Sequence, residues 1–356
     1  MNQPKRDLKN LTQDQLVDFV RSLGQPDFRA RQLLAWIYRP GKIGFDEMTD
    51  LAKVFREVLQ KYACISRFES FQVERSRDGS AKFAFRLDDA ELIESVLIPE
   101  EDRSTLCLST QVGCAMGCSF CCTGSMGFTR NLCTAEIINQ VCAVRDWLIA
   151  QGLPPLTNLV FMGMGEPLAN ITPLLSAISL LTEQRGLDFS ARRITVSTCG
   201  LIPQMLELGR KTQVNLAVSL HATNDEVRSQ LMPVNRRYPL EALLQACHDF
   251  PRKKRQRIMI EYTLFDGIND NDGDALALAK LLHGLPCKIN LLSVNATDKE
   301  AFKSPDRARV LTFQKILRDK GHTVFIRQSR GADISAACGQ LAARSKKPRQ
   351  ALCVTK

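Results

Sequence analysis

From about residue 105 onward, apolar segments alternate with amphipathic ones, and this alternation limits the possible folds more than any other feature of the chain. Stretches with helical periodicity, such as 135–150 and 174–182, separate most of the apolar segments. Strands that alternate with helices predict an α/β fold built on a parallel sheet. The expected strands are residues 105–109, 159–164, 194–198, 214–220, 258–264, 289–294 and 324–328.

Before residue 105 the pattern is different. Residues 8–62 show helical periodicity, and the spacing of Thr12 and Gln15 fits a capping box at the start of the first helix. Residues 67–110 alternate as strands do, with a hairpin turn at 77–80. We therefore expect a helical accessory domain over 1–65, a β-rich linker over 66–104, a large α/β domain over 105–345 and a basic tail over 346–356.

Three cysteines follow the first expected strand of the large domain, in the spacing C-x-x-x-C-x-x-C. They are Cys114, Cys118 and Cys121. Sheets of this kind place their chemistry on loops at the carboxyl ends of the strands, which is where these cysteines stand. Three thiolates can bind three irons of a [4Fe-4S] cluster and leave the fourth iron open. An open iron can chelate the amino and carboxylate groups of S-adenosylmethionine.

Two plainer interpretations compete with the cluster. Free cysteine is often a small buried hydrophobe. Zinc usually takes four ligands, commonly two close pairs, but no second Cys/His pair stands near the motif and His221 is far along the chain. The odd count of 13 cysteines, with no secretory signal, suits a reducing compartment and makes structural disulfides unexpected.

Polar residues recur where the later strands are expected to end. Gly165 and Glu166 follow one strand, Ser197 ends the next, Ser219-Leu220-His221 ends another, and Asn295 follows a later one. Any one of them is more often an ordinary turn residue than a ligand contact. Their recurrence at strand after strand favours a common binding site.

The chain carries a net charge of +10, from 48 basic and 38 acidic residues. Basic runs at 252–257 and 344–349 suit a polyanionic partner such as RNA, although each run can equally be a solvated loop or tail. The polar N-terminus does not resemble a signal peptide, and no segment has the length of a membrane span. We therefore expect a cytoplasmic protein without membrane contact.

Several motifs together resemble the RlmN/Cfr family of radical S-adenosylmethionine RNA methyltransferases. They are the cysteine motif of 114–121, Met-Gly-Met-Gly-Glu-Pro at 162–167, Ser-Leu-His-Ala at 219–222 and Ala-Ala-Cys-Gly-Gln-Leu at 336–341. The likeness begins near residues 28–30 and 45–48 and runs through nearly the whole chain. It implies a partial (β/α)6 barrel with a helical accessory domain and a β-hairpin linker.

The resemblance also implies residue roles. Cys114, Cys118 and Cys121 match the ligands of one [4Fe-4S] cluster, and Gly165, Glu166, Ser197, Ser219, Leu220, His221 and Asn295 match positions that bind S-adenosylmethionine. Cys338 matches the cysteine that carries a methyl group, Cys107 its resolving partner and Glu94 a proton acceptor. From composition alone, Cys107 and Cys338 are better explained as buried structural residues.

The implied reaction methylates carbon 2 of an adenine in 23S rRNA and in tRNA, and it uses two S-adenosylmethionine molecules per turnover. The resemblance further implies an electron donor such as flavodoxin and a monomeric enzyme. Two alternatives stay open, which are methylation at carbon 8 and a noncatalytic RNA-binding protein whose cysteines hold zinc.

The sequence departs from the family pattern at three places. Residues 296–302 lack the usual loop rich in proline and aromatic residues, and this loop is expected to influence substrate binding. Cys122 and Cys199 stand where the family usually has other small residues, and we expect both to serve in packing.

Overall fold

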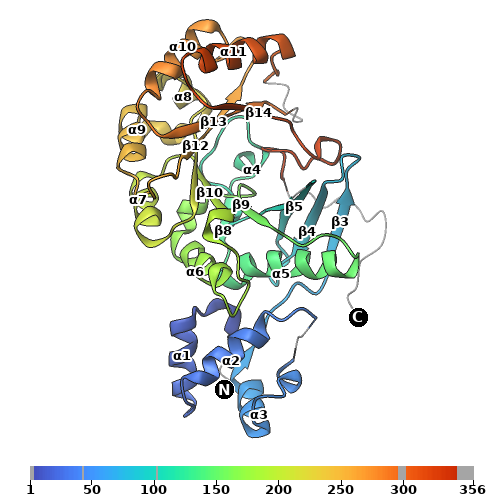
Figure 1. Cartoon of the computed structure of the whole chain (residues 1–356). Helices are drawn as coiled ribbons and strands as arrows, with labels where there is room; N and C mark the ends of the chain where they lie inside the picture. Colours follow the sequence, from blue (N-terminus) through green and yellow to red (C-terminus); the bar gives the residue numbers. More distant parts are fainter. Residues whose placement is uncertain (1–3, 42–43, 102, 296–301, 343–356) are drawn as a thin grey trace.

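The computed structural model describes residues 4–41, 44–101, 103–295 and 302–342. Within them, the centre is a ten-stranded sheet with the order β14-β13-β12-β11-β10-β9-β6-β5-β4-β3 (Figure 1). Its strands are β3 (Phe71–Arg75), β4 (Ala81–Arg86), β5 (Leu92–Glu100), β6 (Arg103–Cys107), β9 (Asn158–Phe161), β10 (Ile194–Thr198), β11 (Asn215–Ser219), β12 (Ile258–Leu264), β13 (Cys287–Ser293) and β14 (Val324–Arg327). From β6 to β14 all neighbours are parallel, whereas β3, β4, β5 and β6 pair antiparallel. The predicted α/β fold with a parallel sheet is confirmed.

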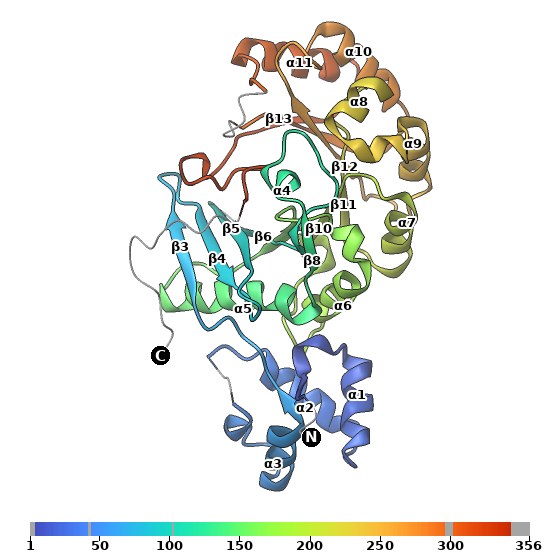
Figure 2. The ribbon, with the colours of Figure 1, turned by 180° about the vertical axis from the view of Figure 1, so that it is seen from behind.

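Helices connect the parallel strands, as crossovers between parallel neighbours require. They are α5 (Thr134–Ala150), α6 (Ile171–Thr182), α7 (Ile202–Lys211), α8 (Asp225–Leu231), α9 (Leu240–Asp249), α10 (Asp272–Leu281) and α11 (Arg307–Asp319). Figures 1 and 2 show helices following the outer side of the curved sheet. Along β12 the alternation of side chains sends Tyr262 outward, where its ring lies 5.6 Å from that of Phe313 on α11. The same alternation turns Glu261 and Thr263 toward the cavity on the inner side.

A small helical module precedes the sheet and packs on α5. Its elements are β1 (Arg6–Asp7), η1 (Leu8–Asn10), α1 (Gln13–Ser22), α2 (Phe28–Ile37), η2 (Phe45–Glu47), α3 (Lys53–Tyr62) and β2 (Ala63–Cys64). The expected capping box forms, because Thr12 N donates to Gln15 Oε1 at 3.0 Å and Gln15 N donates to Thr12 Oγ1 at 3.5 Å. The buried Lys9 Nζ donates to Asn139 Oδ1 of α5 at 2.7 Å. The parallel pair β1–β2 was not predicted, because two residues are too few to show a period.

Several short elements were not predicted from the sequence, and some of them adjoin the cysteine motif or the end of the chain. They are β7 (Gln111–Gly113), α4 (Cys122–Ser125), β8 (Phe128–Asn131), η3 (Pro167–Asn170), η4 (Ala191–Arg193), η5 (Pro233–Arg236) and η6 (Ala332–Ile334). The segment after β14 returns to the β3–β4 hairpin, whose turn lies where it was predicted (Figure 1). Ser76 Oγ donates to Asp333 Oδ1 at 2.5 Å, and Lys82 Nζ donates to Ile334 O at 2.8 Å.

No helix among the described residues has both the length and the apolar character needed to span a membrane. The predicted basic tail of 346–356, the basic run of 344–349 and residues 296–301 of the divergent segment lie outside the described residues.

Candidate active site

The cysteine loop runs from β7 to α4 and is fixed at both ends by backbone contacts. At its start Gly113 has a φ of 73°, and a Cβ there would lie 1.9 Å from Gly127 O, so only glycine fits. Cys114 N donates to the same carbonyl oxygen at 2.7 Å. At its end Cys122 N donates to Gly339 O at 2.7 Å. The loop is thus held between β8 and the C-terminal segment.

The three thiols of this loop line one cavity of about 190 Å³. Burial, with a smaller contribution from the nearby Cys121, raises the pKa of Cys114 to about 11. Burial also raises the pKa of Cys118, and so do Cys121 and Cys114. Thiols whose pKa is raised in this way, as in Cys114 and Cys118, become thiolates at neutral pH beside a strongly positive group, which metal coordination supplies.

The chemistry of these donors fits an iron–sulfur cluster. Among the described residues, no three His, Cys, Asp or Glu side chains converge as the ligands of a single ion would. Cluster thiolates bind different irons, so they need only share a wall. Cys114, Cys118 and Cys121 share such a wall.

Gly165 and Glu166 form the floor of this cavity at the carboxyl end of β9. The φ of Gly165 is 95°, and a Cβ there would lie 2.5 Å from the Cβ of Gln111. The Glu166 carboxylate is buried and accepts from Cys199 N at 2.8 Å and from Leu168 N at 3.0 Å. Burial raises the pKa of Glu166, while these backbone donors lower it. Glu166 therefore also joins two strand ends.

His221 is held in one orientation on the opposite wall. It has a left-handed backbone with a φ of 58°, and Asn269 Nδ2 donates to its carbonyl oxygen at 2.7 Å. Its Nδ1 accepts from Thr263 N at 3.0 Å, which leaves Nε2 as the protonated nitrogen of the neutral ring. Burial, with a smaller contribution from Arg228, lowers the pKa of His221 to about 3. The ring is therefore uncharged near neutral pH.

The remaining predicted ligand-binding residues divide into two groups. Ser197, Ser219 and Asn295 line the same cavity as the three thiols, as the recurrence at strand ends predicted. Leu220 is fully buried and does not line the cavity, although its carbonyl oxygen accepts from Arg228 Nε at 3.1 Å. Six of the seven predicted positions thus meet at one cavity, and Leu220 supports it from behind.

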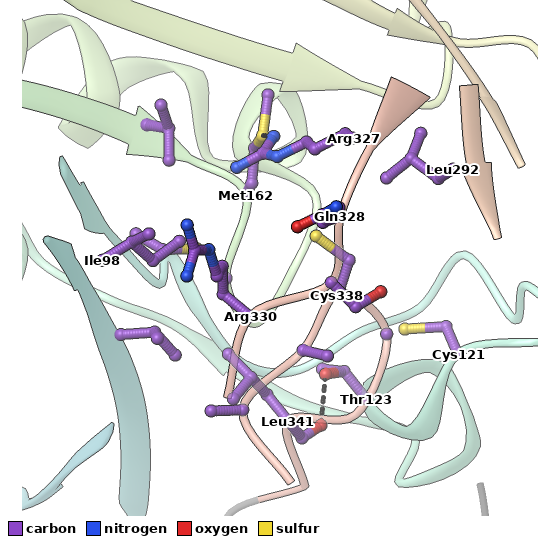
Figure 3. Close-up of a pocket in the computed structure, with 18 residues that line it drawn as sticks. Ile98, Cys121, Thr123, Met162, Leu292, Arg327, Gln328, Arg330, Cys338 and Leu341 are labelled. Atoms are coloured by element: carbon purple, nitrogen blue, oxygen red, sulfur yellow. Dashed lines mark hydrogen bonds between the residues drawn. The ribbon is translucent and has the colours of Figure 1, made fainter. Parts of the chain in front are cut away.

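A second cavity, of about 100 Å³, adjoins the first and holds the other two predicted cysteines. Cys107 ends β6, and Cys338 lies in the C-terminal segment, where it also lines the first cavity (Figure 3). Asn295 Nδ2 donates to Cys338 O at 3.0 Å. All described cysteines are free thiols. The structure therefore brings together two cysteines that lie far apart in the sequence.

Glu94 lies away from both cavity walls. Its buried carboxylate accepts from Ala342 N at 3.0 Å and forms an ion pair with Lys82 at 3.4 Å. Lys82 also donates to the carbonyl oxygen of Ile334 at 2.8 Å. In this conformation Glu94 helps to hold the segment that carries Cys338.

Arg228 of α8 is a site residue that sequence reasoning missed. Although fully buried, it donates to Cys199 O at 2.8 Å, to Ser219 O at 3.2 Å and to Asn235 Oδ1 at 2.8 Å. It therefore ties together the ends of neighbouring strands behind the cavity. A lone arginine in a polar segment gave no signal of this burial.

Arg327 and Glu261 were also missed. Arg327 ends β14 and lines both cavities, while the buried Glu261 lines the first and accepts from Asn290 Nδ2 at 2.9 Å. Both residues stand inside apolar strand segments. Only the alternation of side chains between the two faces of each strand could have indicated that these two side chains point inward.

The basic run of 252–257 lies at the amino ends of the parallel strands, opposite the carboxyl ends that carry the cysteine loop. It borders a cavity of about 670 Å³ next to the starts of β10, β11, β12 and β13. The charged residues that line this cavity are Arg192, Lys253, Arg255, Arg257 and Lys288, and no carboxylate in the described part of the chain lines it. These cations therefore stand a full strand length from the cysteines.

Comparison with known proteins agrees with this architecture. Residues 6–65 match the family described as ribosomal RNA large subunit methyltransferase N-terminal domain, and residues 108–279 match the radical SAM superfamily. A relative from Desulfotalea psychrophila, named dual-specificity RNA methyltransferase RlmN, is 56% identical over 96% of this chain and 96% of its own length. The chain belongs to the RlmN family.

Two further relatives support the assignment to RlmN. A Geobacter sulfurreducens protein of the same name is 53% identical, over 94% of this chain and 91% of its own. The crystal structure of a radical SAM methyltransferase from Sphaerobacter thermophilus has a TM-score of 0.89 and 44% identity, and it covers 95% of this chain and 100% of that one. The chain is thus a methyltransferase with the radical SAM fold, and its family implies a [4Fe-4S] cluster, S-adenosylmethionine and a reductant.

Proposed function

We propose that this enzyme methylates carbon 2 of an adenine in 23S rRNA at the peptidyl-transferase centre, and in tRNA next to the anticodon. The observation that carries the proposal is the position of Cys338, which lines both the cavity of the three thiols and the cavity of Cys107. A methyl group on Cys338 can therefore be activated on one side and its sulfur released on the other. The dual specificity in the name of the relatives supports both RNA substrates.

Carbon 2 of adenine lies between two ring nitrogens and is too electron-poor to attack a methyl donor by itself. In the proposed route Cys338 Sγ accepts a methyl group from one S-adenosylmethionine by displacement. A reduced cluster bound to Cys114, Cys118 and Cys121 would supply a deoxyadenosyl radical from a second S-adenosylmethionine. That radical would take a hydrogen atom from the methyl group of Cys338 and become deoxyadenosine, and the methylene carbon would then bond to the adenine. The adduct radical would lose one electron, which the oxidised cluster would accept, together with its ring proton.

The product is released by the chain's own residues. A carboxylate, for which we propose Glu94, takes the ring proton. Cys107 then attacks Cys338 Sγ and frees the methylated base, which leaves a disulfide between the two cysteines. Because Glu94 is bound to Ala342 N and Lys82 in this structure, this role requires the C-terminal segment to shift when RNA binds.

The partners of the reaction follow from the same proposal. Residues 1–65 and the cations near 252–257 contribute RNA contacts, 66–104 form a linker and 105–345 form the catalytic domain, with 346–356 as a basic tail. The enzyme acts as a monomer in the cytoplasm, where its RNA substrates are, and takes its electrons from a donor such as flavodoxin.

Mass spectrometry of nucleosides tests the proposed product. RNA from cells that have the gene should contain 2-methyladenosine, which should disappear on deletion and return with a plasmid copy. The appearance of 8-methyladenosine instead would replace carbon 2 by carbon 8. If neither nucleoside depended on the gene, the proposed substrate would be wrong.

Two cysteine variants test the proposed route. Cys338→Ala should lose the mass of one methyl group at that residue and never become linked to RNA. Cys107→Ala should still methylate Cys338 and should accumulate as a ribonuclease-sensitive adduct of raised mass. Normal turnover by Cys107→Ala, or methylation of RNA without alkylation of Cys338, would contradict the two-cysteine route.

A further inference from the structure

The side chain of Arg327 leaves the end of β14 and points into the space between the two cavities, toward Met162 (Figure 3). Its one hydrogen bond among the described residues runs from Nη1 to Met162 Sδ at 3.9 Å, and no described carboxylate forms an ion pair with it. A sulfur is a weak acceptor, and a guanidinium has five N–H donors. Most of the donors of this cation are therefore available to another group.

No carboxylate of the described residues lines the cavity that Arg327 shares with Cys107. Its charged lining residues are Arg327 and Arg330, and the rest of the wall near Cys107 is apolar, with Val96 from β5 and Val160 from β9. Such a wall disfavours a thiolate, because an unpaired charge away from water is unstable. Burial, with a smaller contribution from Cys338, raises the pKa of Cys107 to about 12, and Arg327 acts in the opposite direction.

The acidic groups near Arg327 also indicate which partner is available to its guanidinium. Those that act on its charge are Cys338 of the C-terminal segment, Glu261 of β12, Cys107 of β6 and Glu100 of β5. The pKa of Glu100 is lowered by a hydrogen bond from Arg103 and by the charges of Arg327 and Arg330. The carboxylate of Glu261 accepts a hydrogen bond from Asn290. Arg327 also acts to lower the pKa of Glu261, but Glu261 lines the first cavity, so of these acidic groups Cys107 and Cys338 are the ones that share the second cavity with Arg327.

We propose that Arg327 stabilises the thiolate of Cys107 during release of the methylated RNA. The inference rests on the proposed function, since it deepens its last step. In that step the Cys107 sulfur bonds to Cys338 Sγ while the bond from Cys338 Sγ to the methylene carbon breaks. The electron pair goes to the carbon, which takes up a proton and becomes the methyl group, so that the two sulfurs are oxidised and the carbon is reduced.

The test follows the decay of the RNA–protein adduct in the cluster-loaded enzyme. Arg327→Gln should methylate Cys338 and form the adduct, and then release it at least about tenfold more slowly than the wild type near pH 7.5, since each pKa unit changes the thiolate fraction tenfold. Raising the pH toward 9.5 should speed release of the adduct in Arg327→Gln and reduce the difference between its release rate and that of the wild type. Arg327→Lys, which keeps a cation in the cavity, should recover most of the rate.

Arg330→Gln is the matched control, because it removes an equal charge from the same cavity wall. It should leave the pH dependence of adduct decay as in the wild type. Iron content and methylation of Cys338 show whether a variant is folded, since both precede release. If Arg327→Gln does not fold, Arg327→Met carries the same test, because an unbranched apolar chain suits a wall that includes Met162 and Leu292.

The outcomes separate the inference from the proposed function. Wild-type decay with an unchanged pH profile in Arg327→Gln would overturn the inference, and so would failure to form any adduct because RNA no longer binds. If Cys107→Ala itself accumulates no adduct, the proposed release step fails, whatever Arg327 does. Slow release that high pH restores, in the Arg327 variant but not in Arg330→Gln, supports the inference.

Discussion

The two ends of the parallel strands carry polar residues of opposite character. At the carboxyl ends of the strands, charged side chains such as Glu166 and Arg228 are buried and bound by the protein itself, Glu166 by Cys199 N and Arg228 by Ser219 O. At the amino edge, cations such as Arg192 and Arg255 are exposed around a large cavity whose described wall residues include no carboxylate. The first arrangement fixes geometry, whereas the second offers charge to a partner.

This difference shows that net charge alone does not reveal where the basic residues lie relative to the cysteines. The net charge of +10 and the run of 252–257 suggest a protein that holds RNA near its chemistry. The structure instead separates the basic run from the cysteines by the length of the strands. Substitutions at the carboxyl edge should therefore damage folding and cofactor loading, and substitutions at the amino edge should change only binding.

The largest effect is expected for Cys118→Ala. It should abolish cluster loading, because two thiolates are left for three irons, while the barrel stays folded. Iron analysis and visible absorbance after anaerobic reconstitution measure the loss. Cys122→Ala is the control, since its side chain lies outside the wall of the cluster cavity, and it should retain iron. Full iron in Cys118→Ala would remove this residue from the ligand set.

Arg228→Gln should lower the free energy of unfolding by about 3–5 kcal/mol, because it removes the partner of several buried carbonyl groups. Denaturant unfolding of the iron-free protein measures this change without interference from the cluster. Arg255→Gln, which removes the same charge at the exposed edge, should stay within about 0.5 kcal/mol of the wild type. Equal losses in both variants would erase the distinction between the two edges.

His221 predicts how the carboxyl edge responds to acid. Its folded pKa of about 3 lies below the usual 6.5, so protons favour the unfolded chain. The stability that it contributes is complete above about pH 6.5 and is lost as the pH falls toward 3, which amounts to about 2 kcal/mol by pH 5. His221→Asn should show a shallower decline between pH 7 and 5 in denaturant unfolding. A parallel decline in both proteins would assign the acid sensitivity to other groups.

The smallest effect is expected at the amino edge. Replacing Arg192, Arg255 and Arg257 by glutamine should weaken RNA binding about tenfold and reduce the salt slope by about 3, with methylation of saturating RNA unchanged. Binding titrations at several salt concentrations measure the slope. The matched control changes Arg21, Lys211 and Lys315, which already stand in surface ion pairs. If both triple variants showed the same salt slope, the cations at the amino edge would have no special role in RNA binding.

Much of the fold was readable from sequence, because helices and strands are local patterns. The capping box at Thr12 and the turn at 77–80 lie where their spacing placed them, and the parallel strands follow the apolar segments. Elements such as β1, β7 and α4 escaped, because a few residues cannot show a period. These short elements form because the longer elements next to them fix the positions of their ends.

The sequence by itself determined that three thiols lie close together, because cysteines spaced within one loop cannot move far apart. It also determined the edge of the sheet where Glu166 and Ser197 stand, since parallel strands end together. Only the tertiary structure decided that Cys107 and Cys338 share a cavity, that Arg228 is buried behind the site and that the basic run faces away from it. These facts depend on contacts between distant segments, and local spacing carries no information about which distant side chains packing will bring together.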